Sequence, residues 1–314
     1  MAIPENFRTI RLPAIAAPMF LTSGPDLVVA TCNAGVIGTF PALNQRTTQG
    51  FVDWLEEIEG RLAPKAAPYG VNLIVHRSNP RLEADLAEVV RHKVPLVITS
   101  LGAVRDLVDA VHSYGGLVFH DVINRRHAEK AAEAGVDGII AVAAGAGGHA
   151  GLMSPFSLLA EIRQVFDGTL VLSGAMNTGA QIAAARLMGA DMAYLGTRFI
   201  ATREAMVPED YKSMIVESRM ADVIYTPNIS GVGASFLAPS IRAAGLDPEK
   251  LAPHGQLDMG SEAKAWSRIW SAGQGVGGIS DVPGAGELCE RLIREYQTAL
   301  RAAATDPFLS QDAG

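Results

Sequence analysis

Short apolar runs alternate with longer segments of helical periodicity from the N-terminus to about Thr202, and this alternation restricts the fold more than any other feature. The runs are rich in β-branched residues and recur roughly every 20–35 residues, as strands do when helices separate them. Parallel strands need such a crossover helix, because a tight turn cannot bring the chain back in the same direction. The sequence therefore predicts a parallel sheet with the strands Ala14–Met19, Val36–Phe40, Tyr69–Val75, Pro95–Ser100, Leu117–Val122, Gly138–Ala143, Thr169–Gly174 and Met192–Phe199.

The segments between these runs carry apolar residues at helical spacing. In Phe51–Leu62 the apolar residues recur three or four positions apart, which places them on one face of a helix. Glycine stands where several of these segments end, at Gly35, Gly135 and Gly189, as expected after a helix C-terminus. The further predicted helices are Arg81–His92, Ala103–Ser113, Arg125–Ala134, Ser157–Phe166, Gly179–Met188 and Ala285–Ala304.

Eight strand–helix units in about 200 residues match the arithmetic of a (β/α)8 TIM barrel. An open doubly wound sheet is the alternative, and periodicity alone does not exclude it. We expect the barrel core over residues 1–203 and an irregular, partly helical insertion over 204–270, which forms a lid or side subdomain. A glycine-rich turn and the closing helix over 271–304 then return to the barrel.

Composition and charge indicate which class of molecule the protein binds. The net charge is −7 and Lys and Arg do not cluster, which argues against a nucleic-acid surface and favours small molecules. The two cysteines, Cys32 and Cys289, suit neither a disulfide framework nor a metal site. The N-terminus lacks the order of a signal peptide and no apolar run reaches membrane-spanning length, so we expect a cytoplasmic protein. A homodimer is compatible with the sequence.

Small residues follow the last two predicted barrel strands. Phosphate is commonly held by these two loops in a TIM barrel. Ser173–Gly179 opens a helix and Gly196-Thr197 follows the next strand, so both can present backbone N–H groups to an anion, aided by a helix dipole. Each is alternatively an ordinary strand-to-helix turn. Arg198 either binds phosphate or pairs with a neighbouring carboxylate.

A glycine- and alanine-rich loop, Ala143–Gly151, follows the sixth predicted strand and carries a single ionisable group, His149. A loop with so little side chain allows a large flat ligand to approach the backbone. The spacing Gly145-Ala146-Gly147-Gly148-His149-Ala150 also matches a dinucleotide-binding turn, but that motif belongs to the first unit of an open sheet. We therefore expect His149 to carry chemistry, with a solvated turn as the alternative.

Two further strand ends suit a flat heteroaromatic ring. Pro18-Met19 offers backbone polar groups beside a thioether, and Asn72 offers both a donor and an acceptor. The alternatives are that Met19 fills the core and that Asn72 is a turn residue.

Taken in order, these motifs resemble the nitronate monooxygenase (2-nitropropane dioxygenase) family. The resemblance runs from about Ile15 to Thr202, and Ser271–Gly278 resembles the family's late glycine-rich turn. The segments that carry it are Ala17-Pro18-Met19, Ala34-Gly35-Val36-Ile37-Gly38, Gly70-Val71-Asn72, Ala146-Gly147-Gly148-His149-Ala150-Gly151, Gly189-Ala190-Asp191 and Leu195-Gly196-Thr197-Arg198-Phe199.

The resemblance implies a TIM barrel that binds FMN, and it assigns His149 to the face of the flavin where substrate sits. His149 would act as a base toward a nitroalkane or as a donor that orients the nitro group. His120 would supply a second substrate contact, or be structural. The residues implied for the cofactor are Ala17, Pro18, Met19, Asn72, Gly147, Gly148, Ser173, Gly174, Ala175, Met176, Gly196, Thr197 and Gln274, and no metal is implied.

The activity that the resemblance implies is oxidation of alkyl nitronates by oxygen to a carbonyl compound and nitrite. The same superfamily contains flavin-dependent enoyl-ACP reductases and NAD(P)H:quinone reductases, so hydride transfer from NAD(P)H to an enoyl thioester or quinone is the alternative. A flavin-binding protein without turnover is a third. Two segments depart from the family: Ser173–Gly179 lacks its Gly-Gly pair, and Asp121 follows His120 where some relatives carry His-Lys. An inward-pointing Asp121 would disfavour an anionic reduced flavin.

Overall fold

Eight parallel strands close into a barrel in the computed structural model, which describes residues 3–102, 104–253 and 268–312. Neighbouring strands follow one another in chain order, and β9 returns to β1 with Ile15 opposite Tyr194. This closure confirms the TIM barrel and excludes the open sheet. The barrel strands are β1 (Ala14–Ala16), β2 (Ile37–Pro41), β3 (Tyr69–Ile74), β4 (Leu96–Ser100), β5 (Leu117–Val122), β6 (Gly138–Val142), β8 (Thr169–Ser173) and β9 (Met192–Leu195).

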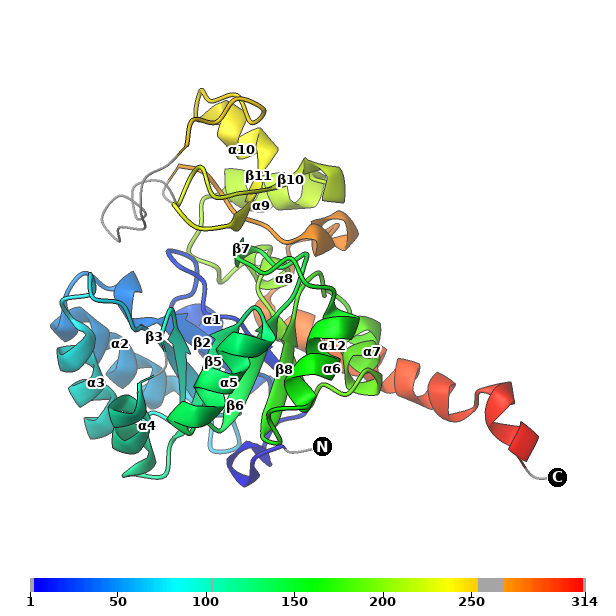
Figure 1. The fold of residues 1–314 in the computed structure, drawn as a ribbon, viewed down its shortest axis with the longest axis horizontal. Helices are drawn as coiled ribbons and strands as arrows, with labels where there is room; N and C mark the ends of the chain where they lie inside the picture. The colour runs from blue at the N-terminus through cyan, green and yellow to red at the C-terminus, as the bar shows by residue number, and fades with distance from the viewer. Residues whose placement is uncertain (1–2, 103, 254–267, 313–314) are drawn as a thin grey trace.

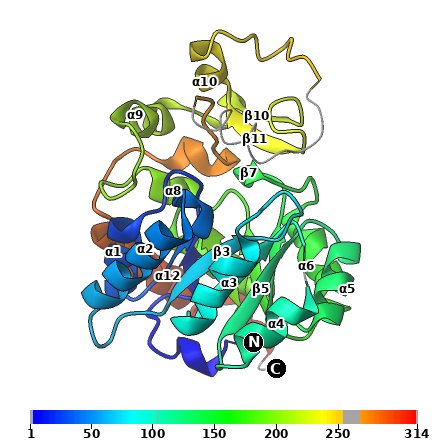
Figure 2. The same ribbon diagram turned by 90° about the vertical axis from the view of Figure 1, so that its left-hand side faces the viewer.

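Helices surround the barrel on its outer side (Figures 1 and 2). The last of them, α12, packs against both α7 and α1 and so completes the ring. The helices of the ring are α1 (Pro25–Asn33), α2 (Thr48–Arg61), α3 (Leu82–Arg91), α4 (Arg105–His112), α5 (Arg125–Ala134), α6 (Pro155–Arg163), α7 (Gly179–Leu187) and α12 (Ala285–Ala304). Short 3-10 helices are η1 (Glu5–Phe7), η2 (Ala42–Asn44), η3 (Met220–Asp222), η4 (Gln274–Gly278) and η5 (Pro307–Asp312).

Local sequence signals explain where these helices begin and end. The Asn124 side chain accepts a hydrogen bond from the His127 N–H and so caps the start of α5. Gly135 ends the same helix with a φ of 88°, a left-handed conformation that favours glycine. On α2, the predicted apolar face is buried at Phe51, Leu55 and Ile58.

Side chains alternate between the interior of the barrel and the surrounding helices. On β5, Phe119 packs inside the barrel, whereas Val118 and Val122 pack with the outer helices. The interior is a closed apolar core formed by residues such as Ile98 and Ile140. Asp121 has the same parity as Phe119 and therefore points inward at the carboxyl end of the strand.

A second, smaller layer lies over the carboxyl ends of the barrel strands (Figures 1 and 2). It contains an antiparallel sheet in the order β10-β11-β7, and here the expectation of an irregular, helical insertion was incomplete. Its strands have at most four residues, and β7 pairs with β11 across a long stretch of chain, so periodicity does not reveal them. The elements are β7 (Gly148–His149), β10 (Val223–Thr226), β11 (Ala234–Leu237), α8 (Thr197–Ile200), α9 (Glu209–Glu217) and α10 (Ala238–Ala243). Residues 254–267 of the predicted insertion lie outside the described residues.

The last predicted strand, Met192–Phe199, was too long. Strand β9 ends at Leu195, because Gly196 takes a right-handed helical conformation and its carbonyl accepts hydrogen bonds from the N–H groups of Phe199 and Ile200. The short helix α8 therefore replaces the end of the strand.

Within the described residues, none of the helices is long and apolar enough to span a bilayer. The same part of the chain holds no cluster of His, Cys, Asp and Glu arranged for a metal ion. Both thiols, Cys32 and Cys289, are buried and unbridged, and burial raises their pKa values.

Candidate functional site

A cavity of about 1090 Å³ opens at the carboxyl ends of the barrel strands, beneath the second layer. Its walls come from nearly every barrel strand and from the segments 206–233 and 270–275. The structure thus brings together every site residue predicted from the sequence except Gln274. The predicted residues that line it are Ala17, Pro18, Met19, Asn72, His120, Gly147, Gly148, His149, Ser173, Gly174, Ala175, Met176, Gly196 and Thr197.

His149 lies in a strand and not in a free loop. Residues Gly148 and His149 form β7, in which His149 pairs with Ala234 of β11. The Gly148 N–H donates to Ser271 Oγ at 2.6 Å, and Tyr225 Oη donates to the Ala150 carbonyl at 3.1 Å. The backbone on both sides of the imidazole is therefore fixed by the upper layer.

Ser271 connects three parts of this layer. Its hydroxyl accepts from the Gly148 N–H and donates to the Ser235 carbonyl at 2.6 Å. The Ser271 backbone exchanges hydrogen bonds with the hydroxyl of Tyr211, whose ring stacks on Trp270 with the centroids 4.8 Å apart. Tyr211, Trp270 and Ser271 line the cavity. The sequence did not assign them to the site, because no motif links them to His149.

A chain of polar side chains crosses the mouth of the barrel from β3 to β5. Asn72 Nδ2 donates to the Ile98 carbonyl and to Ser100 Oγ, at 3.1 and 2.9 Å. Ser100 Oγ in turn donates to Asp121 Oδ2 at 2.6 Å. Both hydrogens of the Asn72 amide are thereby used, so its Oδ1 is the atom left to accept a hydrogen bond from a ligand.

Asp121 is the acidic group in this row of hydrogen-bonded side chains. Burial raises the pKa of its carboxyl group to about 6, against the Ser100 hydrogen bond and the charge of His149, which both lower it. Its Oδ1 atom is buried and accepts no hydrogen bond from the described residues. Burial raises the pKa of Tyr194 well above its usual range, and the negative charge of Asp121 raises it further.

His120, the residue before Asp121, is buried and also lines the cavity. Its Nδ1 lies 2.8 Å from Thr99 Oγ1, and burial lowers the pKa of the ring to about 4. The imidazole is therefore neutral at pH 7. It can offer a substrate a neutral donor or acceptor, but not a charge.

The other end of the cavity presents backbone groups. Gly174 and Ala175 have positive φ angles of 136° and 53°. None of the described residues accepts a hydrogen bond from the N–H groups of Gly174, Ala175 and Met176. These N–H groups are left to donate to a ligand.

The start of α7 is not open to an anion, contrary to expectation. The N–H groups of Asn177 and Thr178 donate to Gln181 Oε1, and the Gly179 N–H donates to Glu295 Oε2 at 2.7 Å. Side chains of the protein thus occupy the helix N-terminus, one of them a carboxylate. The N–H groups at the start of α7 are therefore paired within the protein, and the Glu295 carboxylate already lies at the positive end of the helix dipole.

The late glycine-rich turn packs backbone to backbone against the loop before His149. Gln274 N donates to the Gly145 carbonyl at 2.8 Å, and Gly273 N donates to Thr197 Oγ1 at 2.8 Å. A Cβ on Gly273 would lie 2.6 Å from the Gly145 carbonyl oxygen, so a side chain has no room here. Gln274 supports the loop at Gly145 through its backbone and does not itself line the cavity.

Arg198 pairs with a carboxylate, one of its two expected roles. The buried guanidinium donates to Asp281 Oδ1 at 2.7 Å and to the Asp281 carbonyl at 3.2 Å. It joins the end of the barrel to the returning chain.

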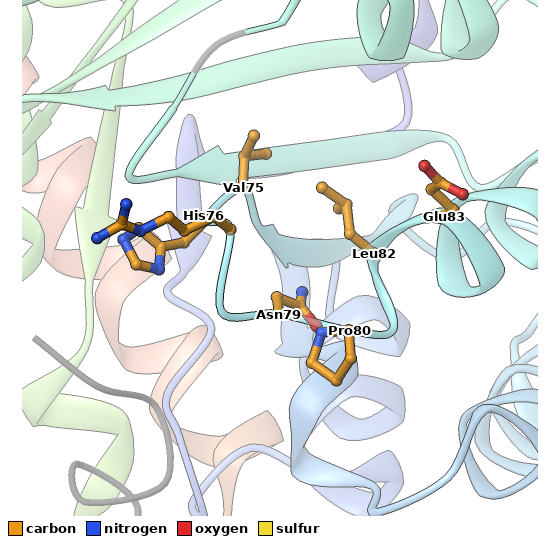
Figure 3. A pocket seen from close by; sticks show the side chains of 7 residues that line it. Val75, His76, Asn79, Pro80, Leu82 and Glu83 are labelled. Carbon is orange, nitrogen blue, oxygen red and sulfur yellow. The ribbon is translucent and has the colours of Figure 1, made fainter.

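A smaller hollow of about 460 Å³ lies beside the β3–α3 loop, between His76, Asn79 and Glu83 (Figure 3). Its polar groups are used locally: Asn79 Nδ2 donates to the Ile74 carbonyl, and His76 Nδ1 lies 2.7 Å from Ser78 Oγ. These two polar groups therefore stabilise the loop itself.

Comparison with known proteins gives a consistent result. The family model described as nitronate monooxygenase matches residues 4–295. A nitronate monooxygenase of Paraburkholderia phytofirmans is 27% identical, over 92% of this chain and 93% of that protein. A 5-hydroxy-7a-methyl-1-oxo-octahydro-1H-indene-4-carboxyl-CoA dehydrogenase of Rhodococcus jostii is 26% identical, over 71% of this chain but 62% of that protein. The crystal structure of a nitroalkane oxidase from Streptomyces ansochromogenes superposes with a TM-score of 0.82, at 25% identity, over 95% of this chain and 99% of that one.

Proposed function

This chain belongs to the nitronate monooxygenase family, and we propose that it oxidises alkyl nitronates, or their parent nitroalkanes, with FMN and molecular oxygen, giving a carbonyl compound and nitrite. The observation that carries the proposal is the placement of His149 in one cavity with unbonded backbone N–H groups at Gly174–Met176. One end of the cavity thus suits acid–base chemistry, and the other suits a phosphate.

The residues present fit a flavin, the cofactor class of this family. Asn72 Oδ1 can accept from a ring N–H, and Pro18-Met19 gives the ring an apolar wall. The N–H groups of Gly174–Met176 suit the phosphate of FMN, together with Gly196 and Thr197. Bound FMN would accept electrons from the nitronate and pass them to oxygen.

The protein's own part is to bind, orient and move a proton. An imidazole on β7 can take the α-proton of a nitroalkane or donate a hydrogen bond to the nitro group of a nitronate. His120, neutral at pH 7, would provide a further contact on the β5 side of the cavity. We also propose that residues 204–270 act as a lid and that 1–203 with 271–304 form the catalytic core. The homodimer and the cytoplasmic location stay predictions.

An anaerobic titration tests this proposal. The purified protein should show a flavin absorption spectrum that bleaches on addition of an alkyl nitronate, and readmitted oxygen should be consumed with release of nitrite. Extraction and chromatography of the chromophore should identify FMN. A colourless protein that cannot be reconstituted with FMN would refute the proposal. Bleaching by NADH or NADPH and not by a nitronate would refute the nitronate activity alone.

The second candidate is reduction of an enoyl thioester or quinone by NAD(P)H through the same cofactor. Exposed apolar side chains at the mouth of the cavity favour it, since a small nitronate does not need them. They are Leu21, Leu101, Ile123, Met206 and Tyr225. Steady-state oxidation of NAD(P)H that depends on an enoyl thioester or quinone would support this alternative, and the absence of all turnover would leave a flavin-binding protein.

A further inference from the structure

We propose that the C-terminal arm of this chain, residues 297–309, is the interface for a second copy: two arms pack antiparallel across a twofold axis, and each tip contacts the outer helices of the other copy's barrel. The arm comprises the end of α12 and the first residues of η5. It extends away from the barrel, and the C-terminus lies far from the body of the molecule (Figure 1). This surface is separate from the cavity and does not depend on the proposed function.

The apolar stripe of α12 is longer than the surface that the barrel offers it. Apolar residues recur three or four positions apart along the whole helix, as in Leu288, Leu292, Tyr296, Ala299, Leu300 and Ala303. The first two are buried, and Tyr296 packs against the same core cluster. The last three belong to none of the apolar clusters that the described residues form. The pattern that seats α12 on the barrel therefore continues beyond the barrel.

The helix leaves the barrel just after Tyr296. Glu295 Oε2 accepts a hydrogen bond from the Gly179 N–H at 2.7 Å, which fixes α12 on the start of α7. Gly179 has no room for a side chain, because the backbone of α12 at Tyr296 lies directly against it. From there to Ala304 the helix extends about 12 Å further. An apolar helix face stabilises a helix mainly by packing, so this stripe requires a partner surface.

The tip of the arm exposes two large apolar side chains. Phe308 is 77% exposed and Leu309 is 66% exposed. The outer helices α6 and α7 also carry exposed apolar side chains, Phe156 at 71% and Leu187 at 70%. Since α12 packs on α7, the arm leaves the body beside these helices. A projecting stripe, an apolar tip and an apolar face together indicate a protein interface.

The charges of the arm complement those of the same arm in the reverse direction. Arg294 and Asp306 are both exposed, and each lies six positions from Leu300. In an antiparallel pair with Leu300 opposite Leu300, Arg294 of one copy lies level with Asp306 of the other, and symmetry forms the pair twice. A parallel pair would instead place like charges together. This self-complementarity favours a second copy over a partner of another kind.

The apolar surface is large enough for a stable dimer. Phe156 and Phe308 of two copies would together bury roughly 600 Å². A small specific interface buries about 1,200 Å² in total, so these side chains supply about half of it. The stripe and the exposed leucines add to this area. Ala299 and Ala303 flank Leu300 with small side chains, which allows two helices to approach closely.

Sedimentation equilibrium of the full chain tests the proposal. The wild type should be a dimer, and Leu300→Glu should raise its dissociation constant about 100-fold or more, because it places a charge at the centre of the stripe. Phe308→Ala should raise it about tenfold. Thr298→Glu is the matched control: this exposed residue lies on the opposite face of the same helix, and the variant should dimerise like the wild type. All three variants should keep the circular dichroism and thermal stability of the barrel. A monomeric wild type, or equal dimerisation of Leu300→Glu and Thr298→Glu, would overturn the proposal.

A charge exchange tests the antiparallel orientation. Arg294→Asp and Asp306→Arg should each weaken the dimer about three- to tenfold, because each places like charges level with one another twice. The double variant only inverts the two pairs and should regain most of the affinity. Additive losses in the double variant would contradict this arrangement. A monomer that instead binds anionic lipid vesicles, and loses this binding in Phe308→Ala, would identify the arm as a lipid anchor and overturn the dimer.

Discussion

His149 and Ala234 lie opposite each other in an antiparallel pair, although 84 positions separate them in the chain. The residue expected to do the chemistry therefore takes its position from the upper layer as much as from the barrel. The first two predictions follow from this relationship.

Replacing His149 by Gln should remove the proton acceptor while keeping a polar side chain of similar reach. We expect kcat/KM for a neutral nitroalkane to fall by about 10²–10⁴. Flavin content should stay at the wild-type level, as measured by absorbance after gel filtration. His76→Gln in the β3–α3 loop is the control and should change neither quantity. Full activity in His149→Gln would exclude the acid–base role.

Ser271→Ala removes the acceptor of the Gly148 N–H and the donor to the Ser235 carbonyl. Leaving such groups without partners should lower the free energy of unfolding by about 1–3 kcal/mol. Because β7 loses a tether, kcat/KM should also fall about tenfold. Ser240→Ala is the matched control: Ser240 too is buried, and its hydroxyl is bonded to the Leu237 carbonyl and to both the N–H and the carbonyl of Trp270, but to no atom of β7. It should lose stability and keep its kcat/KM, and a similar loss of activity in both variants would contradict the tether.

Gly273→Ala should disturb the support of the cofactor loops. The added methyl group would lie 2.6 Å from the Gly145 carbonyl oxygen and 2.9 Å from Gly147 N, so the two glycine-rich segments must separate. We expect the dissociation constant for FMN to rise about tenfold or more, measured by flavin fluorescence during titration of the apoprotein. Gly60→Ala in α2 meets no atom within 4 Å and should instead stabilise the fold by about 0.5–1 kcal/mol. Unchanged FMN affinity in Gly273→Ala would argue against this role of the turn.

Asp121 should reduce stability as the pH rises. The pKa of its carboxyl is about 6 in the folded protein against 3.8 in the unfolded chain, so the neutral form favours folding. The contribution is fully present below about pH 3.8 and is lost as the pH rises through 6. In the apoprotein, Asp121→Asn should therefore gain about 2–3 kcal/mol over the wild type on going from pH 4 to pH 8. Urea unfolding at both pH values measures this gain, and a difference that does not vary with pH would refute it.

The barrel could be predicted from the sequence because each unit carries its own signals. Continuous apolar runs such as Gly138–Val142 define strands that are buried on both sides, and glycines such as Gly135 end the helices between them. The sheet of the upper layer could not be predicted, since β7 has two residues and exists only by pairing with β11. Strand propensity says nothing about partners so far apart in the chain.

The site was predictable where it depends on strand ends. Pro18, Asn72 and His149 were placed because the carboxyl ends of barrel strands meet at one mouth. Ser271 and Tyr211 were not, because their role depends on hydrogen bonds that only the folded chain creates. The inward direction of Asp121 follows from strand parity, but its link to Ser100 required the register between β4 and β5.

The chain leaves the barrel and re-enters it at nearly the same point. Arg203 N donates to the Pro283 carbonyl at 3.0 Å, and Ala285 N donates to Glu204 Oε2 at 2.8 Å. The chain between these two points is therefore, for the barrel, one long loop with its ends held together. The entropic cost of closing such a loop grows only slowly with its length. Insertions and deletions there should leave the barrel intact, so this loop is a natural place for substrate preference to diverge among homologues. Two demands limit that divergence. Any replacement must still supply a strand to pair with Gly148 and His149, and it must keep the turn at Gly273 and Gln274 against Gly145 and Thr197.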